Sequence, residues 1–349
     1  MMEQRFYNRR KFLATSALAL TAAQLNIGAA DAFVFDGEIK VPKLSADGLT
    51  APWQLKQIDA GLLSVGYGEA GPGDGEPIIL LHGWPYDIWS FALVVPLLVA
   101  KGYRVLMPYA RGFGPTSFRS AQTPRNGQQA ALACDVIDFM DALKIDSAII
   151  CGFDWGARSA NIIASVWPER CKAMVAVSGY IIVDRQLNRM PLPPKAELGW
   201  WYQYYFSTER GNAGYRENTY EFNKLIWELA SPKWQFDEKT FRNTATSFNN
   251  EDHVEIVIHN YRWRLELEPG EARYDDIENQ LVQKPAISVP AITIGSDFDG
   301  KGADGSAYRK RFSGKYLHKV LHGIGHNVPQ EDPSAFAQAV LEAAEMSKN

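Results

Sequence analysis

The sequence is poor in the features that mark several large classes of protein. Only three of its 349 residues are cysteine, and the 36 Lys and Arg nearly balance the 40 Asp and Glu, so the net charge is −4. Neither sign of charge forms a long run, which argues against a protein that binds a nucleic-acid backbone. Because no stretch of about 18 uninterrupted apolar residues is present, stable membrane insertion is not expected. No internal repeat and no Gly, Pro or polar bias is found either, which excludes fibrous and disordered proteins.

The three cysteines, Cys134, Cys151 and Cys171, form an odd and widely spaced set, which is a poor disulfide framework even for an exported protein. We expect all three to be buried as small hydrophobic side chains. Aromatic residues, in contrast, are abundant, with ten Trp, fifteen Tyr and seventeen Phe. This is more than a plain core needs, so the composition favours a protein with an aromatic-lined pocket.

Residues 1–32 resemble a twin-arginine export signal. Arg9 and Arg10 precede a modest apolar stretch, which ends in small residues. An amphipathic first helix is the alternative, but Gln24 and Asn26 interrupt the apolar run. The pattern predicts a protein that is periplasmic or secreted once the signal has been removed.

Beyond this signal, short apolar β-branched runs alternate with longer helical patterns. That alternation is typical of an α/β fold with a mostly parallel sheet and helices on both faces. Strands are predicted at residues 62–67, 77–82, 103–108, 147–151, 173–178, 291–295 and 315–321. Helices are predicted to include residues 127–143, 157–167 and 333–346.

The alternation breaks between residue 180 and about residue 284, where a helical pattern carries five tryptophans and many tyrosines. We interpret this segment as a helical cap inserted into the α/β domain. The predicted organisation is an export signal at 1–32, a first part of the core at 33–180, the cap at 181–284 and a second part of the core at 285–349.

Two short motifs suggest ligands that their surroundings do not support. Gly66, Gly68 and Gly71 spell G-x-G-x-x-G, but the GPGDGEP that follows cannot open the helix that would hold a pyrophosphate, so a turn leaving the first strand is the better interpretation. His322 and His326 are four residues apart, but their glycine-containing segment is a poor helix, and no acidic or Cys ligand accompanies them. Neither a cofactor nor a metal site is predicted.

The strongest signal for chemistry is GFDWG, which follows an apolar strand and precedes a helical run. Gly152 and Gly156 flank Asp154 in the pattern G-x-nucleophile-x-G, in which the glycines let the chain turn sharply and lift the central side chain clear of the sheet. A carboxylate at this position can displace a leaving group from saturated carbon, and water can later open the resulting ester. An aspartate can equally cap the following helix. The turn alone leaves both roles open.

The segment HGWP at 82–85 follows directly on a predicted strand, so its backbone N–H groups can face the turn at Asp154. The N–H groups of Trp84 and Trp155 would then form an oxyanion hole. Such a hole stabilises the negative oxygen that develops when water attacks an ester.

Two acids and one histidine occur further along the chain. Asp297 and Asp299 follow the predicted strand AITIGS, at the carboxyl end where catalytic acids lie in open α/β sheets. His326 lies in a loop after the last strand and before the last helix. The order nucleophile, acid, histidine is that of the α/β-hydrolase triad.

On these motifs the chain resembles the α/β-hydrolase fold, in the branch of epoxide hydrolases and haloalkane dehalogenases, and is most similar to epoxide hydrolases. The resemblance implies Asp154 as the nucleophile, His326 as the base that activates water, and Asp299 rather than Asp297 as the acid that orients the histidine. It also implies a small apolar epoxide and water as substrates, with no cofactor. The motifs that carry it are HGWP, RGFG at 111–114, GFDWG, SDFD at 296–299 and GIGHN at 323–327.

In epoxide hydrolases two tyrosines of the cap hydrogen-bond the epoxide oxygen and protonate the alkoxide. The segment WYQYYF resembles the family's cap motif Y-Q-x-Y-F, which selects Tyr202 over Tyr204 and Tyr205. The segment NYRWR resembles the family's W-Y-R and selects Tyr261, although Asn260 replaces the usual Trp. The alternative is that both tyrosines only pack within an aromatic cap.

The same Asp-His-Asp triad would serve a haloalkane or haloacetate dehalogenase. The Trp155 indole could donate to a halide, but HGWP lacks the Asn that many haloalkane dehalogenases carry there. An arginine cluster for a haloacetate would depend on Arg158 and Arg111, because Trp155 stands where that group has Arg. A catalytically silent binding protein is the non-enzyme alternative. Loss of Asp154, His326 or the glycines of the turn would favour it, and none is lost, so epoxide hydrolysis is the predicted function.

Overall fold

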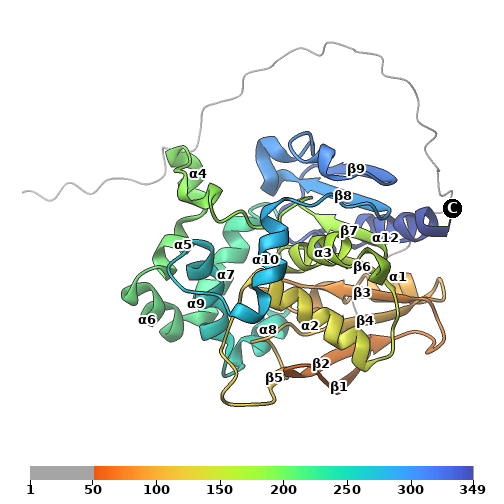
Figure 1. Cartoon of the computed structure of the whole chain (residues 1–349), viewed down its shortest axis with the longest axis horizontal. Coiled ribbons are helices and arrows are strands. Elements are labelled where there is room, and N and C mark those ends of the chain that lie inside the picture. Colours follow the sequence, from red (N-terminus) through yellow and green to blue (C-terminus); the bar gives the residue numbers. More distant parts are fainter. Residues whose placement is uncertain (1–50, 349) are drawn as a thin grey trace, which may run out of the picture. The chain divides into compact units, whose positions relative to one another are not determined.

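The computed structural model describes residues 51–348, so the predicted export signal lies outside the described residues and remains a prediction. A nine-stranded sheet runs through this part of the chain in the order β1-β2-β4-β3-β6-β7-β8-β9, and β5 pairs with β2 (Figure 1). The pairs from β4 to β9 are parallel, whereas β2 is antiparallel to its neighbours. The strands are β1 (Gln54–Ala60), β2 (Leu63–Ala70), β3 (Pro77–Leu81), β4 (Arg104–Pro108), β5 (Ser117–Phe118), β6 (Ala148–Gly152), β7 (Cys171–Val177), β8 (Ala291–Ser296) and β9 (Tyr316–Leu321).

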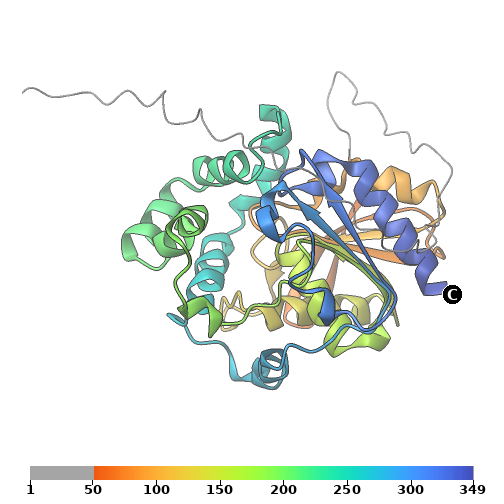
Figure 2. The same ribbon diagram turned by 90° about the horizontal axis from the view of Figure 1, so that it is seen from above.

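Helices cover both faces of the sheet, as the view from above in Figure 2 shows. Successive side chains of a strand point to opposite faces. In β3, Ile78 and Leu80 therefore pack in the cluster that includes α12 (Pro333–Lys348). Ile79 and Leu81 pack in the cluster that includes most of the buried residues of α2 (Gln129–Ala142) and α3 (Trp155–Val166). The helices of the core are α1 (Val95–Val99), α2 (Gln129–Ala142), α3 (Trp155–Val166), α11 (Val328–Glu331) and α12 (Pro333–Lys348).

Seven further α-helices separate β7 from β8, and most of them stand beyond the carboxyl ends of the parallel strands (Figure 1). The last, α10, packs on the core instead, since Glu278 accepts a hydrogen bond from the Gln129 side chain of α2 at 3.0 Å. The exact cap boundaries at 181 and 284 remain a prediction. The seven helices are α4 (Pro194–Gly199), α5 (Trp201–Phe206), α6 (Glu209–Glu217), α7 (Thr219–Ala230), α8 (Glu238–Ala245), α9 (His253–Arg264) and α10 (Asp275–Val282).

The predicted α/β fold is confirmed, with every predicted strand and helix found within a few residues of its expected ends. The sequence does not predict β1, β5 or α1. The interpretation of the G-x-G-x-x-G glycines is partly wrong, because Gly66 and Gly68 lie inside β2 and only Gly71 follows it. A side chain at Gly66 would collide with Pro115, since a Cβ there would lie 2.3 Å from the proline ring. The glycines thus allow close packing.

The three cysteines are all free thiols. Cys151 and Cys171 are buried in the core, as expected. Cys134 is only partly buried, so the prediction that all three are buried is wrong at this position. It lies on α2, next to Asp135.

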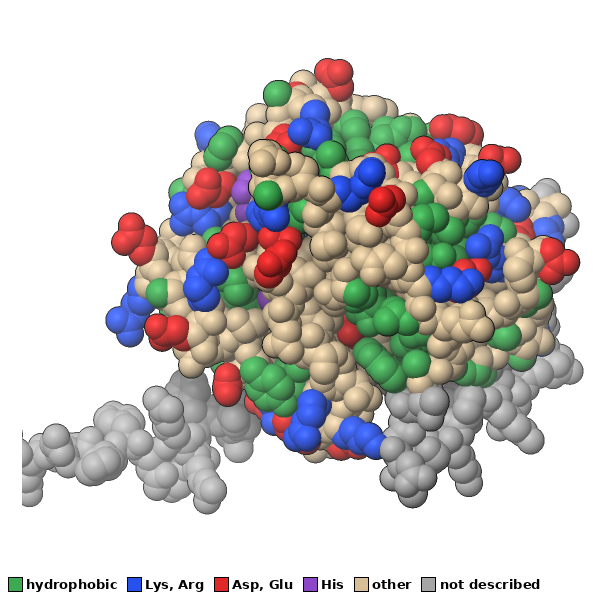
Figure 3. Space-filling view, turned by 90° about the horizontal axis from the view of Figure 1, so that it is seen from below, with side chains coloured by type: hydrophobic (Ala, Val, Ile, Leu, Met, Phe, Trp, Pro, Cys, Tyr) green, Lys and Arg blue, Asp and Glu red, His purple; other side chains and the backbone are tan. Residues whose placement is uncertain are grey.

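On the face seen in Figure 3, basic and acidic side chains are interspersed with apolar ones, and neither sign of charge dominates. None of the helices within residues 51–348 is long and apolar enough to cross a membrane. Over the same residues, no group of three or more His, Cys, Asp and Glu side chains is arranged to hold a metal ion.

Candidate active site

The turn between β6 and α3 holds Asp154 in an unusual backbone conformation, with φ 52° and ψ −126°. L-residues rarely adopt a positive φ, so the surrounding structure has to enforce it. The flanking glycines make this possible. A Cβ at Gly152 would lie 2.4 Å from the carbonyl carbon of Gly156, and a Cβ at Gly156 would lie 2.0 Å from the oxygen of Leu81. The turn therefore accepts no larger residue at either position.

The Asp154 carboxylate faces the loop after β3 and does not cap its own helix. Its Oδ1 accepts a hydrogen bond of 2.8 Å from the N–H of Trp84, and its Oδ2 lies 3.4 Å from Nε2 of His326. The side chain keeps 18% of its accessible surface, so another molecule can reach it. Of the two roles that the turn leaves open, helix capping is therefore excluded.

The environment of Asp154 favours its ionised form. Burial alone would raise the pKa, but the hydrogen bond and charge of His326, the charge of Arg158 and the N–H of Trp155 together bring the pKa below its usual value. The N–H groups of Trp84 and Trp155 thus both face the carboxylate, which is the arrangement expected of an oxyanion hole. Gly83 makes room for it, because a Cβ there would lie 2.2 Å from Oδ1 of Asp154.

His326 lies in the loop between β9 and α11, and this loop is held by Glu331. The Glu331 carboxylate accepts hydrogen bonds from the N–H groups of Gly325 (2.6 Å) and Asn327 (3.0 Å) and from the Ser231 hydroxyl (2.6 Å). Ser231 Oγ in turn accepts from the N–H of His326 at 3.0 Å. Nothing in the sequence pattern marks Glu331 or Ser231, because their partners lie in different elements.

The two candidate acids follow β8 as predicted, but no hydrogen bond joins either of them to His326 within residues 51–348. Asp299 Oδ2 accepts a 2.9 Å bond from the N–H of Ser296 in its own turn. Asp297 forms an ion pair with Lys233 instead, and its Oδ2 accepts a hydrogen bond from Lys233 Nζ at 2.6 Å. The choice of Asp299 therefore remains a prediction.

The Nδ1 atom of His326 lies 3.3 Å from the hydroxyl of Tyr86, a residue that the sequence pattern does not mark. The two rings are stacked, with centroids 5.5 Å apart, and the Phe298 ring lies against His326 at 4.4 Å. These two aromatic rings fix the plane of the imidazole, so its Nε2 points to Asp154.

Tyr202 on α5 and Tyr261 on α9 meet above the oxyanion loop, which is the segment of residues 82–85 after β3. They are 9% and 1% exposed, their rings lie 5.2 Å apart, and each ring lies 5.2 Å from that of Trp84. Burial raises the pKa of both hydroxyls and the charge of Asp154 also raises it, and these effects outweigh the lowering effect of Arg264 and Arg158. Both groups therefore keep their protons and can donate hydrogen bonds.

The other cap residues that could compete are engaged elsewhere. Tyr204 is 47% exposed, and its hydroxyl donates to Glu197 at 2.5 Å. The Nδ1 of His259 accepts from the N–H of Gly127 at 3.0 Å, and its Nε2 lies 3.0 Å from the oxygen of Pro269. Tyr202 and Tyr261 are close enough to Asp154 for its charge to act on their hydroxyls, and their role as acids remains a prediction.

The chain is similar to known proteins. Residues 76–225 match the sequence profile of the alpha/beta hydrolase fold. A crystal structure of a candidate epoxide hydrolase from Klebsiella pneumoniae is 55% identical in sequence and has a TM-score of 0.82, over 84% of this chain and 97% of that one. The chain belongs to the α/β-hydrolase fold family. The family and fold class predicted from the motifs are confirmed.

Curated relatives of this α/β-hydrolase match over a shorter stretch. Epoxide hydrolase B of Mycobacterium tuberculosis is 32% identical over 149 residues, which is 39% of this chain and 41% of that protein. A haloalkane dehalogenase of Mycobacterium marinum is 31% identical over 125 residues, which is 35% of this chain and 41% of that protein. The chain thus spans about two fifths of the length of these curated relatives.

A buried network joins the cap of the hydrolase to its oxyanion loop. The indole N–H of Trp84 donates to the hydroxyl of Tyr215 at 2.8 Å, which lies 2.9 Å from Nε2 of His253. The Nδ1 of His253 lies 2.8 Å from the oxygen of Gly112. Burial lowers the pKa of His253 to about 4, so this ring is neutral at physiological pH. Of the four residues, the sequence motifs contain only Trp84 and Gly112.

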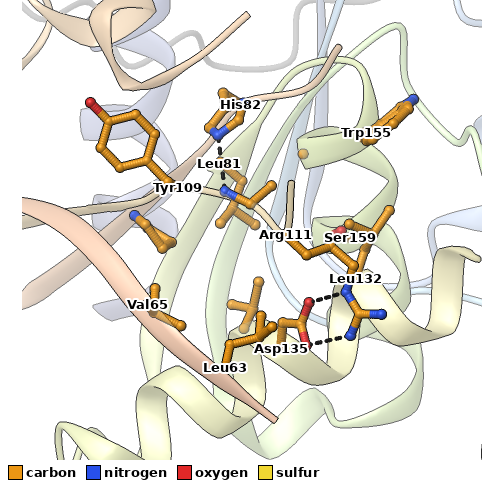
Figure 4. Close-up of a pocket in the computed structure, with 14 residues that line it drawn as sticks. Leu63, Val65, Leu81, His82, Tyr109, Arg111, Leu132, Asp135, Trp155 and Ser159 are labelled. Carbon is orange, nitrogen blue, oxygen red and sulfur yellow. Dashed lines mark hydrogen bonds and ion pairs between the residues drawn. The ribbon is translucent and has the colours of Figure 1, made fainter. Parts of the chain in front are cut away.

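Figure 4 shows residues that line a small cavity between α2, α3 and the strand β2. Its volume is about 40 Å³, and neither Asp154 nor His326 lines it. Its wall includes Arg111, whose guanidinium donates to both oxygens of Asp135 at 2.6 Å. The third donor, Nη1, binds the oxygen of Asn126 at 2.6 Å. Arg111 is therefore a structural residue and not available for a substrate carboxylate.

Asp87 is a fully buried carboxyl group beneath the cap. It accepts from the N–H of Trp89 and from the hydroxyl of Thr244 on α8, both at 2.9 Å, but its other oxygen has no partner. Burial raises the pKa of Asp87 to about 8. The folded state therefore binds a proton that the unfolded state releases at neutral pH.

The raised pKa of Asp87 predicts that the free energy of unfolding falls as pH rises, and that Asp87→Asn removes this part of the pH dependence. The folded pKa of about 8 lies above the unfolded value of 3.8, so the contribution of Asp87 to stability is present in full below pH 4 and is lost as pH rises through 8. The loss is on the order of several kcal/mol at most. In urea denaturation at pH 5 and pH 8.5, the wild type should lose more stability than Asp87→Asn. The surface variant Asp74→Asn should follow the wild type, and parallel losses in all three would contradict the raised pKa.

Proposed function

We propose that this α/β-hydrolase is an enzyme that opens an epoxide to a vicinal diol through an ester at Asp154. The observation that carries the proposal is the pair Tyr202 and Tyr261, two buried and protonated hydroxyls near an ionised carboxylate. An epoxide oxygen becomes a strongly basic alkoxide when the ring opens, so this reaction needs such donors. The names of the Klebsiella and Mycobacterium tuberculosis relatives support the same reaction.

In the first step Asp154 attacks a carbon of the epoxide ring. Its Oδ1 is held by the Trp84 N–H, so Oδ2 is the oxygen free to form the new C–O bond. The ring C–O bond breaks as this bond forms, and the hydroxyl of Tyr202 or Tyr261 gives its proton to the departing oxygen. The product is a hydroxyalkyl ester on Asp154.

In the second step Nε2 of His326 takes a proton from water, and the resulting hydroxide attacks Cγ of the ester. The carbonyl oxygen becomes negative and is stabilised by the N–H groups of Trp84 and Trp155. The Cγ–Oδ2 bond then breaks, and Oδ2 leaves in the diol with the proton that the histidine held. The new carboxylic acid at Asp154 loses its proton, which returns through solvent to the tyrosinate.

The tyrosine pair is tested by Tyr202→Phe, which keeps the ring and its packing against Trp84. Losing one of two acids should slow formation of the ester by about 10- to 1000-fold, which is the usual contribution of one acid group or oxyanion donor. Rapid-mixing kinetics with an aryl epoxide measure this step. Tyr204→Phe, on the same helix but 47% exposed, is the matched control and should react as fast as the wild type.

If Tyr202→Phe opens the epoxide at the wild-type rate while folding normally, Tyr202 is not the acid. Tyr261→Phe should behave like Tyr202→Phe, and the double variant should be nearly inactive. Full activity in the double variant would remove the observation on which the proposal rests.

Dehalogenation is the second candidate, because the buried indole N–H of Trp155 has no hydrogen-bond partner and could hold a halide. A departing halide needs no proton, so this reaction would not depend on the tyrosines. The purified protein should be screened against aryl and alkyl epoxides, haloalkanes and fluoroacetate, with release of diol, halide and protons measured. Diol formation without halide release is the expected result, and halide release alone would favour the dehalogenase.

A further inference from the structure

Two arginines lie one helical turn beyond the reacting groups, one on the core and one on the cap. Arg158 lies in the first turn of α3, four residues after Asp154, and its backbone N–H donates to the backbone oxygen of Asp154 at 3.1 Å. Arg264 is three residues after Tyr261 on α9, and its Cζ lies 5.3 Å from the centre of the Tyr261 ring. The backbone of each arginine thus lies about one helical turn, roughly 5 Å, beyond that of the nucleophile or the acid.

Each of the two guanidinium groups keeps a buried nitrogen that has no hydrogen-bond partner among the described residues. Arg158 is 6% exposed, and although its Nε donates to the oxygen of Ile181 at 3.1 Å, its buried Nη1 has no partner. The buried Nε of Arg264 has no partner either. No ion pair within residues 51–348 includes Arg158 or Arg264, and Glu266, the nearest acid along the chain, pairs with Arg185 and Arg189 instead.

Arginines with a structural role in this protein look different. Arg111 is completely buried and forms a two-bond pair with Asp135. Arg262, two residues before Arg264 on the same helix, donates to Glu268 at 2.9 Å. Buried charges are normally paired in this way, because an unpaired one carries a large desolvation cost.

The positive charges of Arg158 and Arg264 also repel each other. Burial and the charge of Arg264 lower the pKa of Arg158 to about 10, which still leaves it protonated at neutral pH. Asp154 is the carboxylate that offsets the charge of Arg158, but it becomes a neutral ester in the first step of the proposed reaction. At that stage the tyrosinate formed in the same step is the anion that the protein itself places near the two cations, and a carboxylate of the substrate would supply a second.

We propose that Arg158 and Arg264 bind a carboxylate of the substrate, so that the enzyme acts on epoxides that carry an acid group about one helical turn from the ring. This inference rests on the proposed function and replaces the expectation of a wholly apolar epoxide. Guanidinium groups match carboxylates in shape and can donate two parallel hydrogen bonds. The clamp would hold the chain of the substrate and direct the ring to Asp154 from one side.

The charge of the substrate is tested with 5,6-epoxyhexanoate and its neutral amide, 5,6-epoxyhexanamide. The wild type should have a higher kcat/KM for the acid. In Arg264→Gln, kcat/KM for the acid should fall at least about tenfold further than for the amide, since a charge-assisted hydrogen bond contributes about 10- to 100-fold. Arg262→Gln is the matched control and should leave the ratio of acid to amide unchanged. Arg158→Lys keeps the positive charge but cannot donate two parallel hydrogen bonds, so it should also lower the ratio of kcat/KM for the acid to kcat/KM for the amide.

An equal fall for both substrates in Arg264→Gln would overturn the inference, because the arginine would then act on ring opening and not on the carboxylate. A wild type that does not prefer the acid would overturn it too. Binding of hexanoate, measured by thermal unfolding beside hexanamide, does not depend on ring opening. Hexanoate should raise the Tm of the wild type but not of Arg264→Gln. If this holds while no epoxide reacts, the proposed function fails and the carboxylate site stands; if epoxides react without any effect of charge, the reverse is true.

Discussion

His326→Gln is expected to form the ester at Asp154 once and then stop. His326 acts only after the ester has formed, whereas Asp154 and the two tyrosines carry out the first step without it. Turnover should therefore fall by about 1000-fold or more, as is usual when a base that activates the attacking group is removed. Intact-mass spectrometry after incubation with an aryl epoxide should show the protein heavier by one substrate molecule.

Glutamine is close to histidine in size, so we expect the variant to keep the packing between Tyr86 and Phe298 and to fold. His322→Gln is the matched control, because His322 is exposed in the same loop and should leave turnover unchanged. An unmodified His326→Gln protein, under conditions that saturate the wild type, would mean that the histidine acts in the first step or not at all.

Asp154→Asn should abolish both turnover and the mass increase. The amide oxygen can still accept the hydrogen bond from the Trp84 N–H, so the turn and the oxyanion loop should keep their structure. The neutral amide is a poor nucleophile, and the loss in kcat should reach about 10,000-fold or more. Steady-state kinetics and intact mass, with thermal unfolding as the check on folding, measure the effect.

The double variant Asp154→Asn with His326→Gln separates the two roles further. It should show no mass increase, because without the nucleophile no ester forms for the missing base to leave behind. An adduct in the double variant would place the covalent bond on another residue, and retained turnover in the single variant Asp154→Asn would exclude the ester mechanism.

The sheet and the turn at Asp154 could be predicted because their signals are local. Each parallel strand is a short apolar run, and the two glycines around Asp154 are required by contacts within the turn itself and with β3. The strand β1 could not be predicted, because it lies at the edge of the sheet and most of its residues are exposed. Its sequence, QLKQIDA, therefore has no continuous apolar run.

The cap contacts could not be predicted, because they join residues far apart in the chain. Tyr215 meets Trp84 across 131 positions, and no spacing in the sequence indicates that pair. The resemblance to the family selects Tyr202 and Tyr261 by local motifs, whereas Arg264 becomes visible as a candidate only when its lack of a partner is seen. The partner of His326 is a similar case, since two acids follow β8 and local order cannot choose between them.

The central claim, that Asp154 forms the covalent bond to the substrate, is tested most directly by a single turnover in water enriched in heavy oxygen. With the enzyme in excess over the epoxide, the ester is opened by water at Cγ, so the oxygen that enters the diol comes from the carboxylate. The peptide that contains Asp154 should gain one heavy oxygen, and the diol of the first turnover should contain none. Heavy oxygen in that first diol, with an unlabelled Asp154, would mean direct attack by water and would contradict the mechanism.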